Sequence, residues 1–445
     1  MNSMNEVVLT DIGHLAKDWE IKTLEQISSL MTNGFVGTAT SHYVDEQNGI
    51  LYIQGYNVEQ NSFNLNGIKY VSKEFNAKHL KSQLKEGDLL TIQTGDVGLT
   101  TFVSKELEGS NCHALIITRL KSHLCDYKFI SHYLNSHTGR ARLKLLEIGS
   151  TMKHLNVGDL LEFKVPTPQL PEQHKIAQAL TDADNYISAL EKLIEKKKMI
   201  KEGLMVNLLT GKQRLKEFAF NEDGTAKSYK DSELGKIPED WEVIELIDTA
   251  SKSKKWSFVG GPFGSSLKTD DYTEYGIQII QLQNMGDGHF INDNVIYTSV
   301  EKANELLSNN IYAGEIIISK MGDPVARACI MPNHADRYLM ASDGIRLSID
   351  TNKFDTRFIH DFINFKIFRK QAINASTGST RQRISLSELK KLKLFSPSYE
   401  EQLAIGNTFK DLDSQILALD QKLNKAKLLK QGMMQKLLTG EIRLA

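Results

Sequence analysis

Two stretches of the chain carry the same regular spacing of apolar residues, and this spacing predicts two long helices. In each stretch the apolar positions alternate between steps of four and three residues, which places them in one stripe along a helix. Such a stripe is typical of helices that pair in a coiled coil. The first stripe consists of Ile176, Leu180, Ala183, Ile187, Leu190 and Ile194, and the second of Ile405, Phe409, Leu412, Ile416, Leu419, Leu423 and Ala426.

Capping residues predict where these helices begin and end. Pro171 suits a first helical turn, where its missing N–H group is not needed. Ser398 and Glu401 have the spacing of a capping box, in which each side chain satisfies a backbone N–H group of the other residue. Gly211 and Gly440 suit the residue that ends a helix in the left-handed conformation.

Both predicted helices close with nearly the same phrase, "GLMVNLLTGKQRL" at 203–215 and "GMMQKLLTGEIRL" at 432–444. Residues 149–215 align with residues 378–444 without a gap, and 25 of these 67 positions are identical. Upstream, "LAKDWEIKTL" from Leu15 matches "IPEDWEVIEL" from Ile237, and "GDLLTIQTGD" from Gly87 matches "GEIIISKMGD" from Gly314. The offset grows from 222 to 229, so the second copy is longer by 229 − 222 = 7 residues. The chain is therefore predicted to contain two copies of one unit.

Upstream of each helix, short β-type runs alternate with turn residues and one amphipathic helical segment, which predicts a mixed domain. We expect an α+β fold: two globular α/β domains separated by a long antiparallel two-helix coiled coil, with a pseudo-twofold internal repeat. The predicted boundaries are 1–168 for the first domain, 169–211 for the first helix, 212–236 for a linker, 237–397 for the second domain and 398–445 for the second helix.

The two helices are expected to pair with each other, because they match in length and pattern. Since the first helix leads from the first domain to the second, its partner must run back antiparallel, which would give a rod with a domain at each end. A helical hairpin inside a larger core is the alternative. Two similar domains at a fixed separation suit a reader of split DNA sites, because B-DNA repeats its groove faces about every 34 Å. The two domains differ in sequence, so the half-sites should differ.

Composition and charge leave this picture open. The formal net charge of −1 neither suggests nor excludes a nucleic-acid partner. The three cysteines form no CxxC pair, which fits a reducing cytoplasm and argues against a zinc site. No apolar run approaches the length of a membrane span, and the first residues do not resemble a signal peptide. We therefore expect a cytoplasmic protein that contacts no membrane.

Motifs of catalysis are not found in the sequence. It contains no phosphate-binding GxxxxGK[ST] loop, no HExxH motif and no Asn/Asp-Pro-Pro-aromatic motif of amino-methyltransferases. The scattered histidines are interpreted as ordinary surface or core residues. Asp96 and Asp323, in the paired "TGD" and "MGD" turns, are interpreted as turn-stabilising residues, although a carboxylate can also accept from cytosine N4. We predict no enzymatic activity, no cofactor and no metal.

The ordered, duplicated motifs resemble those of the specificity subunits of type I restriction-modification enzymes. They are the Trp-Glu openings at Trp19 and Trp241, the helix starts "PTPQLPEQHKIAQAL" and "SPSYEEQLAIGNTF", the "GST" loops and the "LLTGKQRL" and "LLTGEIRL" closers. The resemblance covers essentially the whole chain, and the second copy departs from it slightly, with Glu400 where the first has Pro171. It implies two target-recognition domains separated by conserved helices. It also implies assembly with two methyltransferase subunits and with translocating restriction subunits on double-stranded DNA.

Three sets of polar residues are candidates for DNA contact, because amides and guanidinium groups read base edges while basic and hydroxyl groups hold phosphates. An exposed polar turn is the alternative for the first set, and strand-end turn residues are the alternative for the second. The first set is Ser150, Thr151, Lys153 and His154 with Ser379, Thr380, Arg381, Gln382 and Arg383; the second is Gln54, Tyr56 and Asn57 with Gln281, Gln283 and Asn284; the third is Gln93, Thr94, Thr100 and Thr101 with Lys320 and Arg327.

A fourth candidate is the pair of early loops "MTNGFVGTATSHY" and "GGPFGSSLK", rich in glycine and hydroxyl groups. These modest patches predict weak DNA binding by the isolated chain. A scaffold that bridges protein partners without reading DNA is the alternative function, and a variant serving a different phage-defence assembly is another. The bases read and the spacer length are not predicted by the sequence.

Overall fold

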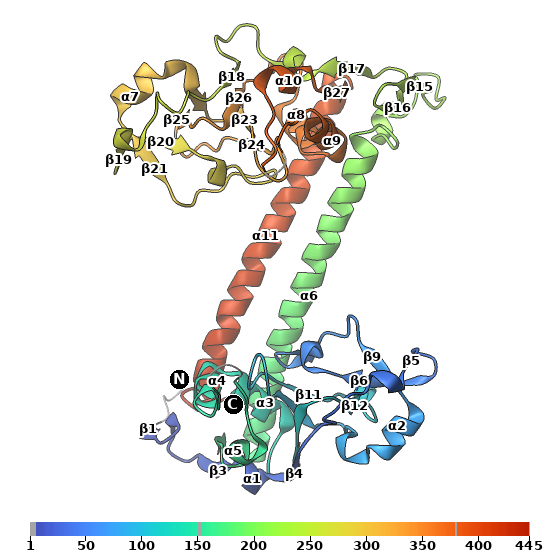
Figure 1. Cartoon of the computed structure of the whole chain (residues 1–445), viewed down its shortest axis with the longest axis vertical. Helices are drawn as coiled ribbons and strands as arrows, with labels where there is room; N and C mark the ends of the chain where they lie inside the picture. The colour runs from blue at the N-terminus through green and yellow to red at the C-terminus, as the bar shows by residue number, and fades with distance from the viewer. Residues whose placement is uncertain (1–5, 150–152, 379–380, 445) are drawn as a thin grey trace. The chain divides into compact units, whose positions relative to one another are not determined.

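The computed structural model describes residues 6–149, 153–378 and 381–444 (Figure 1), and the chain divides into two compact units. The first unit comprises Met1–Lys192 and Asp420–Ala445, and the second comprises Leu193–Leu419. The long helices α6 (Leu170–Leu208) and α11 (Tyr399–Leu437) each cross this division. Each unit therefore contains one domain of short elements and one segment from each long helix.

The first unit is built on two four-stranded sheets. One has the order β11-β10-β13-β4 and is antiparallel throughout, with every residue of β10 buried. The other has the order β12-β6-β9-β5 and contains one parallel pair, β12 with β6. The strands are β4 (Ser28–Asn33), β5 (Tyr43–Val44), β6 (Gly49–Ile53), β9 (Lys69–Ser72), β10 (Leu89–Ile92), β11 (Thr100–Phe102), β12 (Asn111–Cys112) and β13 (Leu115–Leu120).

The second unit repeats this plan. Its sheet β18-β26-β23-β24 is antiparallel and corresponds strand by strand to β4-β13-β10-β11. Its other sheet, β19-β21-β20-β25-β22, again contains one parallel pair, β20 with β25. The strands are β18 (Phe258–Gly260), β19 (Tyr272–Thr273), β20 (Ile277–Ile280), β21 (Ile296–Thr298), β22 (Asn310–Tyr312), β23 (Ile316–Ser319), β24 (Ala328–Ile330), β25 (Arg337–Met340) and β26 (Gly344–Leu347).

An equivalent pair of helices covers the antiparallel sheet in each unit. The pair is α3 (Tyr127–Asn135) with α4 (His137–Lys144) in the first unit, and α8 (Thr356–Ile363) with α9 (Lys366–Asn374) in the second. Aspartates begin α3 and α8 in the same way, because the carboxylates of Asp126 and Asp355 each accept a hydrogen bond from a first-turn N–H group at 2.8 Å. The predicted duplicated α/β architecture is confirmed.

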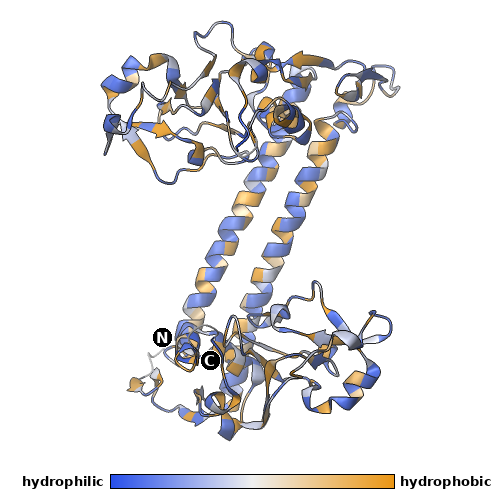
Figure 2. Cartoon of the chain, in the orientation of Figure 1, coloured by the Kyte–Doolittle hydropathy of each residue, from blue (hydrophilic) through white to orange (hydrophobic). Residues whose placement is uncertain are grey.

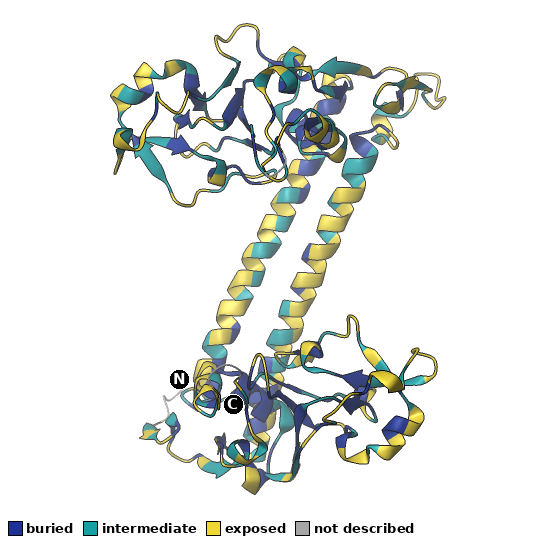
Figure 3. Ribbon diagram, in the orientation of Figure 1, coloured by how far each residue is buried: buried dark blue, intermediate teal, exposed yellow. Residues whose placement is uncertain are grey.

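Within each unit, the two long-helix segments run antiparallel. In the first unit Lys430 pairs with Asp184, and Lys427 with Glu191 at 2.7 Å, so the numbers fall along one helix as they rise along the other. In the second unit, Lys197 donates to Gln415 at 2.7 Å and Lys201 to Asp413 at 2.6 Å. Every residue of both predicted stripes is buried or half-buried. Apolar and polar positions alternate along α6 and α11 (Figure 2), and so do covered and exposed positions (Figure 3). The prediction of antiparallel paired helices is thus confirmed for the segments within each unit.

The helix ends follow the capping prediction only in part. Gly211 and Gly440 have φ angles of +67° and +72°, as a helix-ending glycine requires. The Ser398 hydroxyl accepts from the Glu401 N–H group at 3.3 Å, but the Glu401 carboxylate does not return to Ser398. It binds Arg214 and the indole N–H group of Trp241 instead. The predicted capping box is therefore wrong in its second half, because a buried arginine outcompetes the backbone for that carboxylate.

Residues 212–236, expected to be a linker, fold against the second unit. They include β15 (Tyr229–Ser232) and the start of β16 (Gly235–Pro238), which pair as a hairpin. The Tyr229 hydroxyl donates to the Gly211 carbonyl at 2.8 Å, and Leu215 packs against the hydrophobic core of the unit. These contacts hold the stretch between the end of α6 and the second domain in place.

Candidate nucleic-acid interface

In the first unit, the fold brings two of the predicted polar segments together at the end of β10. The Thr94 hydroxyl lies 3.0 Å from Nδ1 of His154. The adjacent Leu155 N–H group donates to the Gln93 carbonyl at 3.0 Å, so the contact is held by the backbone as well. Lys153 is exposed and pairs with Glu147 at 2.6 Å. Thr94, Lys153 and His154, from two different candidate sets, thus form one surface.

The second unit places the corresponding segments at the end of β23. The Ile384 N–H group donates to the Lys320 carbonyl at 2.9 Å, and Gly322 donates to the Gln382 carbonyl at 3.3 Å. Arg381 and Arg383 are exposed, and Arg383 lies 3.9 Å from the Asp343 carboxylate. The same two loops therefore meet in both units, with more basic groups in the second. Ser150, Thr151, Ser379 and Thr380 lie outside the described residues.

Lys320 has the most constrained ammonium group in this surface. Its Nζ donates to the Ser342 carbonyl at 2.9 Å. Burial lowers the pKa of Lys320 below its ordinary value; the Arg383 charge acts in the same direction, and Asp343 opposes them. The ammonium group is thus held close to Ser342 and Asp343. The backbone carbonyl of Lys320 accepts the hydrogen bond from Ile384 and so holds the second loop in place.

The second candidate set lies at the end of β6 and β20, where each unit has a glutamine beside a tyrosine. Gln54 Nε2 donates to the Tyr43 hydroxyl at 3.4 Å, and Gln281 Nε2 donates to the Tyr272 hydroxyl at 3.4 Å. Gln283 is exposed and donates to Gln281 Oε1 at 3.1 Å. These amides remain at the surface.

Tyr56 also lies at this surface, with 55% of its side chain exposed. Its hydroxyl donates to the Gly67 carbonyl at 3.1 Å. Partial burial raises the pKa of Tyr56, with a smaller contribution from Tyr43, so the phenol stays protonated at neutral pH. It can present a neutral ring and a hydroxyl to a ligand.

Asn57 and Asn284 were expected to contact DNA, but the structure gives them a different role. Both are buried, with exposed fractions of 0% and 1%. Each side-chain oxygen accepts from the backbone N–H group of the glutamine three residues earlier, at 3.0 Å in both units. Each side-chain N–H₂ group donates hydrogen bonds to backbone carbonyls. We therefore leave Asn57 and Asn284 out of the proposed interface.

The third candidate set also contains both buried residues and residues at the surface. Gln93, Thr100 and Thr101 are buried, and the Gln93 amide donates to Asn33 at 2.6 Å. Only Thr94, Lys320 and Arg327 keep polar groups at the surface. The Asp96 carboxylate is held by Arg140, whose guanidinium also donates to the Val97 carbonyl at 2.7 Å. This supports the interpretation of Asp96 as a turn-stabilising residue.

A cavity of about 570 Å³ in the second unit joins the second and third sets. Among its lining residues are Gln281, Gln283, Arg327, Phe263 and Asp343. The Arg327 Nε–H group is buried and makes no hydrogen bond with any described residue. Phe263 lies in "GGPFGSSLK", one of the fourth pair of candidate loops, whereas Asp343 was not singled out from the sequence. Asp343 follows the end of β25, which pairs in parallel with β20, and only this pairing brings it near Gln281.

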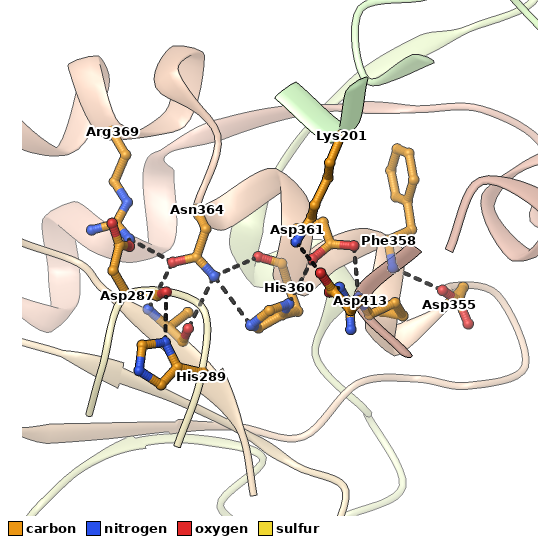
Figure 4. A network of polar contacts seen from close by, with 12 residues as sticks. Lys201, Asp287, His289, Asp355, Phe358, His360, Asp361, Asn364, Arg369 and Asp413 are labelled. Carbon is orange, nitrogen blue, oxygen red and sulfur yellow. Dashed lines mark hydrogen bonds and ion pairs between the residues drawn. The ribbon is translucent and has the colours of Figure 1, made fainter. Parts of the chain in front are cut away.

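A network of polar contacts, buried at its centre, links the loop after Gln283 to the long helices of the same unit (Figure 4). Asp413 of α11 binds both Lys201 of α6 and Arg357 of α8. Arg357 also binds Asp361, 2.7 Å away. Burial alone would raise the pKa of Asp361, but contacts with His360 and Arg357 outweigh it and lower the pKa.

The network continues from α8 to the loop. Asn364 contacts His360 Nε2 at 3.1 Å and accepts from Arg369 at 2.5 Å. Arg369 in turn pairs with Asp287, whose carbonyl lies 3.1 Å from Nδ1 of His289 (Figure 4). The loop that follows the recognition candidates is thereby tied to the helices, and this limits its freedom to move.

In the described part of the chain, none of the helices is both long and apolar enough to cross a membrane. Within the same ranges, no group of three or more His, Cys, Asp or Glu side chains lies close enough together to hold a metal ion.

A family model, the type I restriction modification DNA specificity domain, matches the chain twice, over residues 16–202 and 238–428. The chain belongs to this family. Within it, the chain is a specificity subunit of a type I restriction-modification system and is not itself an enzyme, because catalysis in these systems lies in the methyltransferase and restriction subunits.

Known proteins agree with this assignment. The chain is 25% identical to the type I restriction enzyme MjaVIII specificity subunit of Methanocaldococcus jannaschii, over 81% of this chain and 80% of that protein. It is also 25% identical to the putative MjaX specificity subunit of the same organism, over 98% and 96%. The type I restriction-modification S subunit from M. genitalium has the same fold, with a TM-score of 0.60, 16% identity and coverage of 94% of this chain and 96% of that one.

Proposed function

We propose that the chain directs a type I restriction-modification complex to an asymmetric, bipartite target in double-stranded DNA, with each unit reading one half. The observation that carries this proposal is the repeated meeting of two polar loops at the end of the same strand. Thr94 and His154 meet in the first unit, and the Lys320 and Arg383 loops meet in the second. Hydroxyl, imidazole and guanidinium groups suit phosphates and base edges. Because these groups differ between the units, the two half-sites would differ as well.

The long helices would set the distance between the half-sites and dock two methyltransferase subunits. In support, each helix exposes an apolar pair at the same position of the repeat, since 428 − 199 = 229. Met199 and Ile200 are 65% and 40% exposed, and Leu428 and Leu429 are 69% and 63% exposed. Exposed apolar side chains in two equivalent places suit two copies of one partner. Restriction subunits would join this assembly for cleavage.

A solved relative supports the proposed assembly. Its structure was determined to explain complex assembly and conformational transition of the type I R-M system. It shares the fold at a TM-score of 0.51, with 14% identity over 96% of this chain and 99% of that one. A scaffold that bridges proteins without reading DNA is the competing function, and no described contact favours it over base reading.

The test is to sequence the methylated bases of cells that carry the complete three-subunit system. We expect N6-methyladenine within one split motif of two unlike blocks. Arg383→Ala should relax the motif at one position of one block and leave the other block unchanged. A matched control is Arg337→Ala, because Arg337 lies in β25 and binds Asn304 at 2.9 Å, away from the loops. A scaffold without DNA readout predicts methylation that follows no motif.

A further inference from the structure

The second unit exposes a large apolar side chain on its polar cavity. Phe263 is 85% exposed and lines the cavity together with Gln281, Gln283, Arg327 and Asp343. An exposed phenylalanine needs no explanation when it stands alone. Here it stands among side chains that carry the hydrogen-bonding groups used to read base edges. Its place therefore indicates that it contacts the same bases.

The loop that carries Phe263 is pinned at both ends, so that the exposed position is held by the fold. A Cβ atom on Gly261 would lie 1.9 Å from the Ala341 carbonyl, so only glycine lets the loop pass this close to the end of β25. The Gly261 N–H group donates to the Gly344 carbonyl at 2.7 Å, and Leu267 is buried against Leu339. Between these anchors, Phe263 points its ring outward instead of into a core.

The first unit has a shorter version of the same loop. The Gly34 N–H group donates to the Leu115 carbonyl at 2.7 Å, which is the counterpart of the Gly261 bond. Two residues further on, Val36 is 68% exposed, as Phe263 is two residues after Gly261. Each unit therefore presents one apolar side chain at the same place, and the side chain differs between the units.

The amide beside Phe263 is oriented for one kind of base. Gln281 is held by the Tyr272 hydroxyl, and Gln283 donates one of its two N–H groups to Gln281 Oε1. This leaves Gln283 with one N–H donor and its carbonyl acceptor facing outward. That pair matches N7 and the N6 amino group of adenine in the major groove. The thymine opposite carries a C5-methyl group, which apolar side chains contact.

We propose that Phe263 contacts the C5-methyl group of a thymine whose paired adenine is read by Gln283, so that these two residues determine one A·T pair of the target. This inference rests on the proposed function and adds the base pair and the residues that read it. A wedge that enters between stacked bases would use the same exposed ring. The amide, carboxylate and guanidinium groups around Phe263 favour reading in the major groove, where base edges are distinguishable.

The test uses the chain in complex with its methyltransferase subunits, bound to duplexes of the methylated motif in which each thymine in turn is replaced by deoxyuridine. This replacement removes only the methyl group. The wild-type complex should bind one such duplex about fourfold more weakly, the change expected for one buried carbon. Phe263→Ala should bind the thymine and uracil duplexes equally. Gln283→Ala should lose sensitivity to 7-deazaadenine at the paired adenine.

Tyr275→Ala is the matched control, because Tyr275 is 82% exposed in the same unit and does not line the cavity. It should discriminate as the wild-type complex does. If Phe263→Ala still prefers thymine over uracil as strongly as the wild-type complex does, or if the motif half contains no A·T pair, this inference alone is overturned. A complex with no sequence preference would overturn the proposed function and this inference together.

Discussion

At the scale of single residues, one buried carboxylate fastens the start of α11 to the second domain. Glu401 is fully buried, with 0% of its side chain exposed, and it binds the Arg214 guanidinium at 2.6 Å and the Trp241 indole N–H group at 3.0 Å. In the first unit, Glu172 and Arg443 form the corresponding pair, but their side chains are 12% and 32% exposed. The corresponding Trp19 indole N–H group makes no hydrogen bond with any described residue. We therefore expect the buried pair of the second unit to stabilise its domain more than the partly exposed pair stabilises the first.

We predict that Glu401→Ala lowers the free energy of unfolding of the second unit by about 3 kcal/mol, because it leaves the buried Arg214 guanidinium with only the partly exposed Asp240 carboxylate and the Trp241 indole N–H group with no partner. Glu172→Ala should cost less, since water can reach Arg443. Glu400→Ala, at an exposed neighbouring position, should change stability by no more than about 0.5 kcal/mol. Urea unfolding of the three variants measures the differences. Equal losses for Glu401→Ala and Glu172→Ala would contradict the argument.

His132 is a buried histidine that the fold keeps neutral. Burial lowers its pKa from 6.5 to about 3, and the charges of Lys430 and Lys128 add to this effect. Asp184 lies 3.9 Å away and would favour the charged ring, but its carboxylate is already paired with Lys430. Asn61 donates to Nδ1 of His132 at 3.1 Å, which is a contact to a neutral ring.

This histidine should make the first unit sensitive to acid. As the pH falls below 6.5, the unfolded chain takes up a proton at His132 that the folded chain refuses until about pH 3. Stability attributable to His132 should therefore fall by about 1.4 kcal/mol per pH unit in this window. His132→Gln should remove this part of the slope when unfolding is measured from pH 6 to pH 4. His123→Gln, at an exposed position, should keep the wild-type slope, and a shared slope in all three proteins would refute the assignment.

At the scale of elements, each long helix has an inner and an outer apolar face with different consequences. The inner stripe is buried or half-buried along both helices (Figure 3). Its most buried residues pack in the hydrophobic core of each unit, where segments of both long helices meet the domain. The pair Leu428 and Leu429 lies outside this stripe and is exposed. The inner face therefore holds the helices together, and the outer face is available for a partner.

We predict that Leu428→Asp leaves the free energy of unfolding within about 0.5 kcal/mol of wild type, because the side chain is already in water. The same change should weaken assembly with the methyltransferase subunits by at least tenfold, since it places a charge in an apolar contact. Leu145→Asp is the control, because Leu145 is 84% exposed and follows α4, so it belongs to neither long helix. Co-purification of tagged complexes at graded concentrations measures this, and equal assembly by both variants would count against docking on the helices.

At the scale of the whole molecule, the proposal that the helices set the target spacing can be tested by changing their lengths. One added heptad lengthens a helix by about 10 Å at 1.5 Å per residue, or about three base pairs at 3.4 Å each. Matched insertions after Leu190 and Leu419, which occupy equivalent positions of the repeat since 419 − 190 = 229, should widen the gap in the methylated motif by that amount.

An insertion after Leu190 alone should impair assembly. Beyond the seven added residues, the apolar stripe of the first helix would no longer face the matching residues of the second helix. Sequencing of methylated bases reports the gap, and gel filtration of the complex reports assembly. A gap that stays the same after matched insertions would show that the helices do not measure the target.

The sequence by itself determined the duplication, the two paired helices and the α/β character of both units, because apolar periodicity and repeated phrases are properties of neighbouring residues. It also located the polar loops that meet in each unit. Which polar side chains reach the surface was decided by the tertiary structure. Asn57 follows the exposed Tyr56 and Asn284 follows the exposed Gln283 in the sequence, yet both asparagines are buried. Phe263 and Asp343 reach the Gln281 cavity only because strands far apart in the chain pair beside one another. Exposure and proximity depend on long-range packing, and no local pattern encodes them.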